Sequence, residues 1–110
     1  ELVDLYATFC DLAGLETPDF VQGKSLISNL KYPNKVTSEI AFSIWKNGET
    51  LISNKYYYTE WKRKGSVIDR MLYDIENDEL QMNNIAEIRS NKPIVDSLSF
   101  ILNKHIMSKK

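Results

Sequence analysis

The strongest constraint on the fold is a series of four strand-like segments joined by connections of only a few residues. The segments cover residues 40–45, 51–53, 56–61 and 70–75. The third is rich in tyrosine, threonine and tryptophan, which favour strands. Asn47-Gly48 is the residue pair most typical of a hairpin turn, and a second turn is expected around Lys64-Gly65. Because connections this short join neighbouring strands, we expect residues 39–76 to form an antiparallel meander.

Apolar residues at helical spacing flank this central part on both sides. In residues 2–13 they cover two sides of a predicted helix, and Gly14 is placed to end that helix in the left-handed conformation. Near the C-terminus a single apolar stripe is formed by Ile94, Val95, Leu98, Ile101, Leu102 and Ile106. A helix with one apolar stripe beside a sheet gives an α+β fold, a four-stranded antiparallel sheet packed by a C-terminal helix.

The length of 110 residues allows one domain at most. We assign residues 1–38 to the first helix and a linker, and residues 83–108 to the C-terminal helical part. The net charge of -1 gives no basis for binding nucleic acid or an anionic membrane. Cys10 is the only cysteine, which excludes an internal disulfide and a cysteine-based zinc site. No apolar run reaches the length of a membrane span.

Four short motifs occur in one order along the chain. They are Gln22-Gly23-Lys24-Ser25-Leu26, Tyr56-Tyr57-Tyr58-Thr59-Glu60-Trp61, Leu72-Tyr73-Asp74-Ile75-Glu76-Asn77-Asp78 and Asn84-Ile85-Ala86. With these motifs the chain resembles the C-terminal region of sulfatases, in the iduronate-2-sulfatase-like branch of the alkaline-phosphatase-like superfamily. It departs from the family pattern at Ala7 and Glu79, where the family usually has proline. The shared residues are mostly packing and turn residues.

The resemblance implies a sulfatase C-terminal subdomain, a part of a sulfuric ester hydrolase rather than an enzyme by itself. Such a parent enzyme would use calcium and a formylglycine, which is made from the cysteine of a Cys-x-Pro/Ser-x-Arg motif. Cys10 is followed by Asp11-Leu12-Ala13-Gly14, so this motif is missing here. We therefore expect no catalytic residue, metal site or cofactor within these 110 residues.

The resemblance also implies partners and a location. The N-terminal helix would pack on a catalytic domain of the same parent chain, which is missing here, and a sulfated sugar would be the ligand. The chain begins without Met and inside a helical pattern, which is compatible with a true N-terminus further upstream. A bacterial protein with a periplasmic or secreted location is expected on the same grounds.

Trp45 and Lys46 are the candidate substrate-binding residues. They lie at the end of the first predicted strand, next to a turn, where loops often carry function. Lys46 would meet an acidic or sulfated sugar, and Trp45 would stack on its ring. The alternative interpretation is a plain hairpin with a solvated lysine.

Other chemically active residue types have simpler interpretations. Cys10 is expected to be a small buried residue on an apolar helix. His105 is expected near the end of the C-terminal helix, where the helix dipole favours a positive charge. Asp74, Glu76 and Asp78 lack the spacing of a calcium loop and are expected to form a solvated turn.

Two other functional classes remain open at this stage. The chain could be a free-standing carbohydrate- or protein-binding module with no enzyme attached. It could also be the same subdomain in a related phosphoesterase. A Cys-x-Pro/Ser-x-Arg motif upstream would select the sulfatase, whereas a Ser or Thr nucleophile in a metal-binding context would select the phosphoesterase.

Overall fold

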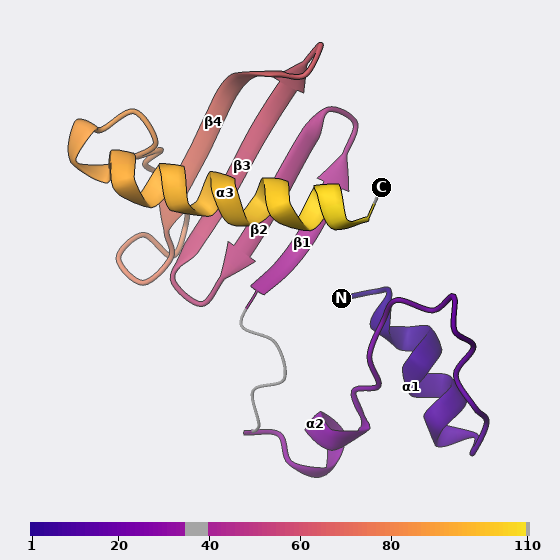
Figure 1. Cartoon of the computed structure of the whole chain (residues 1–110). Helices are drawn as coiled ribbons and strands as arrows, with labels where there is room; N and C mark the ends of the chain where they lie inside the picture. Colours follow the sequence, from indigo (N-terminus) through magenta and orange to yellow (C-terminus); the bar gives the residue numbers. More distant parts are fainter. Residues whose placement is uncertain (35–39, 110) are drawn as a thin grey trace. The chain divides into compact units, whose positions relative to one another are not determined.

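A computed structural model describes residues 1–34 and 40–109 of the chain (Figure 1). The chain divides into two compact units, residues 1–39 and residues 40–110. Each unit is held together by its own internal contacts. The second unit holds the sheet and the long C-terminal helix, which together form the predicted α+β fold.

The sheet of the second unit has four antiparallel strands in the order β1-β2-β3-β4. The strands are β1 (Ile40–Trp45), β2 (Gly48–Ser53), β3 (Tyr56–Arg63) and β4 (Ser66–Asp74). Every strand pairs with the next one along the chain, so the predicted meander is confirmed. The β3–β4 turn is also confirmed, since Lys64 and Gly65 both have positive φ, at 50° and 81°, as this two-residue turn requires.

The β1–β2 turn lies one residue earlier than the sequence predicts. Trp45 pairs with Gly48, so Lys46 and Asn47 are the two turn residues, and Lys46 takes the left-handed φ of 55°. Gly48 belongs to β2, and a Cβ atom there would lie 3.0 Å from Nε1 of Trp61. The lack of a side chain at Gly48 therefore makes room for Trp61 on β3.

Helix α3 (Lys92–Ser108) lies across one face of this sheet (Figure 1). Leu51, Tyr58 and Leu72 from three adjacent strands are fully buried and form one side of the core. Val95, Leu98 and Leu102 from α3 form the other side, as the predicted apolar stripe requires. The result is a two-layer unit, in which the strand side chains alternate between the α3 face and the opposite face.

The first unit contains α1 (Asp4–Leu12) and the short helix α2 (Ile27–Lys31). Gly14 has a φ of 68° and ends α1 as predicted. The N–H of Leu15 donates to the carbonyl of Cys10 at 2.8 Å, and the N–H of Gly14 donates to that of Asp11 at 3.2 Å. This pair of hydrogen bonds defines a Schellman end.

The Gln22–Leu26 motif lies against the start of α1. The N–H of Lys24 donates to Oδ1 of Asp4 at 2.8 Å, and that of Leu26 donates to Oγ1 of Thr8 at 2.9 Å. A Cβ atom at Gly23 would lie 2.0 Å from the carbonyl oxygen of Val3, so only glycine permits this close approach.

Most apolar side chains of the first unit are exposed. Ala7 is the only buried apolar residue of α1, and Phe9, Leu12 and Phe20 are 60% exposed or more. Cys10 is half-buried rather than buried as predicted. Among the residues that the structure describes, no helix has both the length and the apolar character needed to cross a bilayer.

Candidate functional site

The two candidate substrate-binding residues lie together at the tip of the β1–β2 hairpin. Trp45 ends β1 and is 77% exposed. Nζ of Lys46 lies 5.9 Å from the centroid of the Trp45 ring, which is within the range of a cation–π contact. The tip therefore presents an aromatic face and a positive charge beside each other.

This tip is fixed to β3 through Asn47. The N–H of Lys62 donates to the carbonyl of Asn47 at 2.9 Å, and Nδ2 of Asn47 donates to the carbonyl of Lys62 at 3.3 Å. These bonds tie the backbone of the turn to β3. When a ligand binds, only the Lys46 side chain would then have to become ordered.

A buried polar cluster between the sheet and α3 was not predicted from the sequence. Glu60 is fully buried, and its Oε1 accepts a 2.8 Å hydrogen bond from the hydroxyl of Tyr58. Nδ2 of Asn103 on α3 donates to Oε2 of Glu60 at 3.4 Å. Nζ of Lys62 lies 3.6 Å from that same Oε2 and also forms an ion pair with Glu49. The cluster thus links β2, β3 and α3.

Burial alone would raise the pKa of Glu60, but its partners outweigh that effect. Hydrogen bonds from Ser99 and Tyr58, together with the charge of Lys62, hold the pKa of the Glu60 carboxyl below its ordinary value. Burial and the bond to Glu60 raise the pKa of the Tyr58 hydroxyl. Glu60 is therefore a buried carboxylate whose two oxygens both accept hydrogen bonds and whose ionised form is favoured by its partners.

In the acidic turn after β4, the carboxylates accept hydrogen bonds from backbone N–H groups of the same segment. Oδ1 of Asp74 accepts hydrogen bonds from the N–H groups of Glu76 and Asn77. The carboxylate of Asp78 accepts from the N–H groups of Met82 and Asn83 at 3.0 and 2.7 Å. No group of three His, Cys, Asp or Glu side chains able to hold a metal ion occurs within residues 1–34 and 40–109.

The surroundings of His105 and Cys10 indicate structural roles for both residues. His105 lies in the last turn of α3, as predicted. Its ring stacks on Phe42 of β1 with a centroid distance of 3.6 Å and an interplanar angle of 5°. Cys10 is a free, half-buried thiol on α1.

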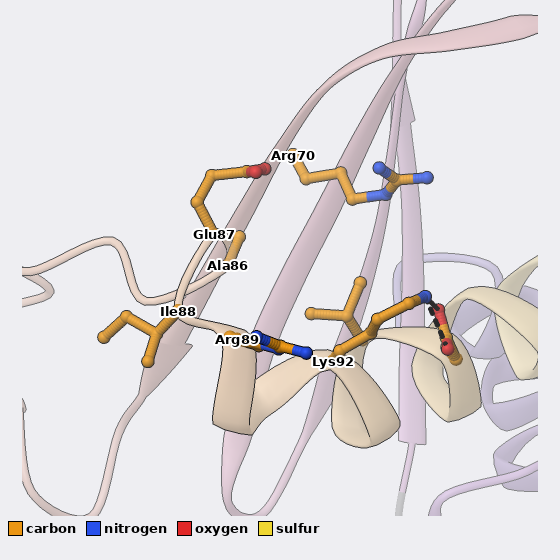
Figure 2. Close-up of a pocket in the computed structure, with 8 residues that line it drawn as sticks. Arg70, Ala86, Glu87, Ile88, Arg89 and Lys92 are labelled. Carbon is orange, nitrogen blue, oxygen red and sulfur yellow. Dashed lines mark hydrogen bonds and ion pairs between the residues drawn. The ribbon is translucent and has the colours of Figure 1, made fainter.

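A cavity of about 360 Å³ lies beside β4 and the start of α3 (Figure 2). Three cationic side chains line it: Arg70 of β4, Arg89 of the short 3-10 helix η1 (Arg89–Asn91), and Lys92, the first residue of α3. Glu87 and Asp96 also line it. No sequence pattern pointed to this cavity, because its charged residues come from segments separated by up to 26 positions (96 − 70).

Comparisons with known proteins identify the fold. No family model matches the sequence, and no curated protein matches it. A proposed sulfatase from Bacteroides thetaiotaomicron VPI-5482 matches with 25% identity and a TM-score of 0.79, over 96% of this chain and 24% of that chain. A protein solved in complex with its substrate D-glucosamine-2-N,6-O-disulfate matches with 21% identity and a TM-score of 0.79, over 93% of this chain and 23% of that chain.

These neighbours belong to one class of protein. They are sulfatases of the alkaline-phosphatase-like superfamily, so the resemblance seen in the sequence is confirmed at the level of the fold. The chain spans about a quarter of the length of the sulfatases it matches. It is consistent, in particular, with a C-terminal fragment of such a sulfatase.

A hydrolase of another ester class has the same fold. The phosphonate monoester hydrolase of Agrobacterium radiobacter matches with 16% identity and a TM-score of 0.70, over 92% of this chain and 23% of that chain. The fold alone therefore does not separate sulfate esters from phosphonate esters as substrates.

Proposed function

We propose that this chain is the C-terminal subdomain of a sulfatase, a sulfuric ester hydrolase, which supports the catalytic domain and forms part of the substrate cleft. The observation that carries the proposal is the match of nearly the whole chain to about a quarter of several sulfatases. A part of this size, without a catalytic motif, has a supporting role. The order of the motifs at residues 22–26, 56–61, 72–78 and 84–86 agrees with it.

The exposed apolar side chains support a domain partner. Phe9, Leu12, Leu15 and Phe20 are between 60% and 77% exposed in the first unit. Apolar surface of this kind in a small unit marks an interaction site. In this proposal the catalytic domain of the same parent chain covers it.

The catalytic groups come from the rest of the parent. In the parent, calcium would supply positive charge for the sulfate oxygens and a formylglycine would supply the nucleophile. The residues described here fit neither group, because Cys10 lacks the modification motif and no metal-binding cluster is present among them. No step of the reaction is assigned to this chain. The parent is expected to be periplasmic or secreted.

The sequence of the parent gene and its activity test this assignment. A Cys-x-Pro/Ser-x-Arg motif upstream and hydrolysis of a sulfate ester, but not of a phosphonate ester, is the expected result. A start codon just before Glu1 with no catalytic domain would select the free-standing binding module instead. A Ser or Thr nucleophile and activity on phosphonate esters would select the phosphoesterase.

Trp45 and Lys46 are proposed to contact the sulfated sugar, with Trp45 on the ring and Lys46 on an anionic group. In the intact enzyme, Lys46→Ala should raise KM about fivefold and leave kcat unchanged, because an exposed charge contributes up to about 1 kcal/mol to ground state and transition state alike. Lys64→Ala is the matched control, since Lys64 also occupies a hairpin turn with positive φ. Equal kinetics for both folded variants would contradict the contact.

A further inference from the structure

The cavity beside β4 and α3 has the size and charge of a ligand site. Its volume of about 360 Å³ lies within the range of small-molecule sites. Three cations and two carboxylates line it, which leaves a net charge of +1 if all five are ionised. The positive end of the α3 dipole adds to the potential near Lys92.

Arg70 contributes its charge to the lining of this cavity. Nε of Arg70 is buried and has no hydrogen-bond partner among the residues that the structure describes. The guanidinium interacts electrostatically with the hydroxyl of Tyr58, so only part of its donor capacity is used. A buried, unpaired N–H is unfavourable, but this atom has no contact with solvent, so Nε itself is not the donor that meets a ligand.

Arg89 and Lys92 can both turn to a ligand. Arg89 is exposed and forms no ion pair with any residue in the described part of the chain. Lys92 is held by Asp96 at 2.9 Å, but the two side chains are 71% and 61% exposed. Exposed pairs of this kind are weak, so Lys92 can exchange Asp96 for a ligand anion at little cost.

Glu87 indicates that the ligand is more than a bare anion. It lines the same cavity and forms no ion pair within residues 1–34 and 40–109. A carboxylate repels an inorganic anion, but it accepts hydrogen bonds from hydroxyl groups. Cations next to a free carboxylate suit a ligand that carries both an anionic group and hydroxyls.

We propose that this cavity binds a sulfated sugar unit, with Arg70, Arg89 and Lys92 on the sulfate group and Glu87 on a sugar hydroxyl. Figure 2 shows Arg70 entering from β4, while Arg89 and Lys92 come from the start of the helical segment. The choice of a sulfated sugar rests on the proposed function, whereas the anionic character of the ligand rests on the cavity. This site is separate in sequence from Trp45 and Lys46 and would hold a second position of the same class of ligand.

Binding to the 110-residue chain tests the proposal. D-glucosamine-2-N,6-O-disulfate, sodium sulfate and D-glucosamine are titrated at constant ionic strength while the amide shifts of residues 86–92 are followed by NMR. The disulfate should shift these amides at lower concentration than sodium sulfate does, and D-glucosamine should not shift them. Absence of shifts with the disulfate, or equal shifts with D-glucosamine, would overturn the site.

Variants separate the roles of the charges. Arg89→Gln should weaken binding of the disulfate about tenfold, the effect of about 1.4 kcal/mol, and it keeps the fold because Arg89 is exposed. Arg63→Gln, on the exposed β3–β4 hairpin, is the control and should not change binding. Glu87→Gln should strengthen binding of sodium sulfate and reduce the preference for the sugar. If Arg89→Gln and Arg63→Gln bind equally, the site is wrong.

These outcomes are independent of the parent's activity. If sodium sulfate and the disulfate bind equally in the wild-type chain, the cavity is an anion site without a sugar contact and the proposal is contradicted. If the disulfate binds as expected but the parent hydrolyses only phosphonate esters, the cavity proposal survives and the proposed function fails.

Discussion

Glu60 is the residue on which the packing of sheet and helix most depends. It is a fully buried carboxylate held by Tyr58, Lys62 and Asn103. Glu60→Ala leaves the Tyr58 hydroxyl without its acceptor and removes the carboxylate that faces Lys62, while Asn103 keeps its bonds to Ser99. We expect a loss of about 3 kcal/mol in the free energy of unfolding. Glu49→Ala removes a mostly buried partner of Lys62, but Lys62 keeps its contacts with Glu60 and Asn103, so the loss should be smaller, about 1.5 kcal/mol. Urea unfolding of both variants measures the difference, and equal losses would contradict the role of Glu60.

The pH dependence of stability gives the same prediction a second readout. The pKa of Glu60 is lowered in the folded chain, so the unfolded chain binds its proton first as pH falls from about 4.3. The stabilisation from Glu60 is therefore complete above that pH and is lost as pH falls through the folded pKa. Glu60→Gln should remove this part of the acid sensitivity. The urea midpoint of wild type should fall more steeply between pH 6 and pH 3 than that of the variant, a range chosen around the ordinary carboxyl pKa.

Among the elements, β4 depends on a side chain outside the sheet. Nδ2 of Asn84 donates to the carbonyl of Arg70, and its Oδ1 accepts from the N–H of Leu72, both at 3.0 Å. The N–H of Ile85 donates to the carbonyl of Leu72 at 2.9 Å. This segment therefore covers part of the free edge of β4, which protects it from pairing with another strand.

Removal of the Asn84 amide should loosen that edge. We expect Asn84→Ala to lower the free energy of unfolding by about 2 kcal/mol, because two β4 groups and the N–H of Ala86 lose their partner. The neighbouring Asn83→Ala should cost less than about 0.5 kcal/mol, as an exposed surface substitution. Hydrogen exchange at the amide of Leu72 should accelerate in the first variant only. Unchanged exchange there would mean that Asn84 does not hold the edge.

The sequence predicts the elements well where the signal is local. The strands and both long helices follow from periodicity, and Gly14 and Gly65 mark positions of positive φ. The β1–β2 turn is displaced because its register depends on Trp61, which packs over Gly48 from another strand. The turn preference of Asn47-Gly48 depends on these two residues alone, so it contains no information about the contact with Trp61.

Only a candidate site carried by one segment could be proposed from the sequence, and its role as a substrate contact stays a prediction. Trp45 and Lys46 are adjacent in sequence, and the structure brings their side chains together. The partner that buries Glu60 on the helix side, Asn103, is 43 residues away. A strand pattern places Glu60 on one face of β3, but it does not show which polar groups α3 brings to that face. The cavity of Arg70, Arg89 and Lys92 was missed for the same reason.

The whole molecule consists of two units with different internal support. In residues 40–110 the sheet and α3 enclose a continuous core that includes Leu51, Tyr58, Leu72 and Leu102. In residues 1–39 the described buried residues are Ala7 and Thr8, and α1 has 9 residues. An isolated helix of that length is marginal in water. The first unit therefore needs a partner surface more than the second one does.

Expression of each unit alone tests this difference. Residues 40–110 should unfold cooperatively in urea and remain monomeric in gel filtration, because their core is complete. Residues 1–39 should give weak helical circular dichroism and no cooperative transition, and their exposed Phe9, Leu12 and Phe20 should promote association. Ser substitutions at these three positions should reduce association of the 110-residue chain without changing the transition of residues 40–110. A cooperative transition in residues 1–39 alone would show that this unit is stable without a partner, which would contradict a catalytic domain that must cover it.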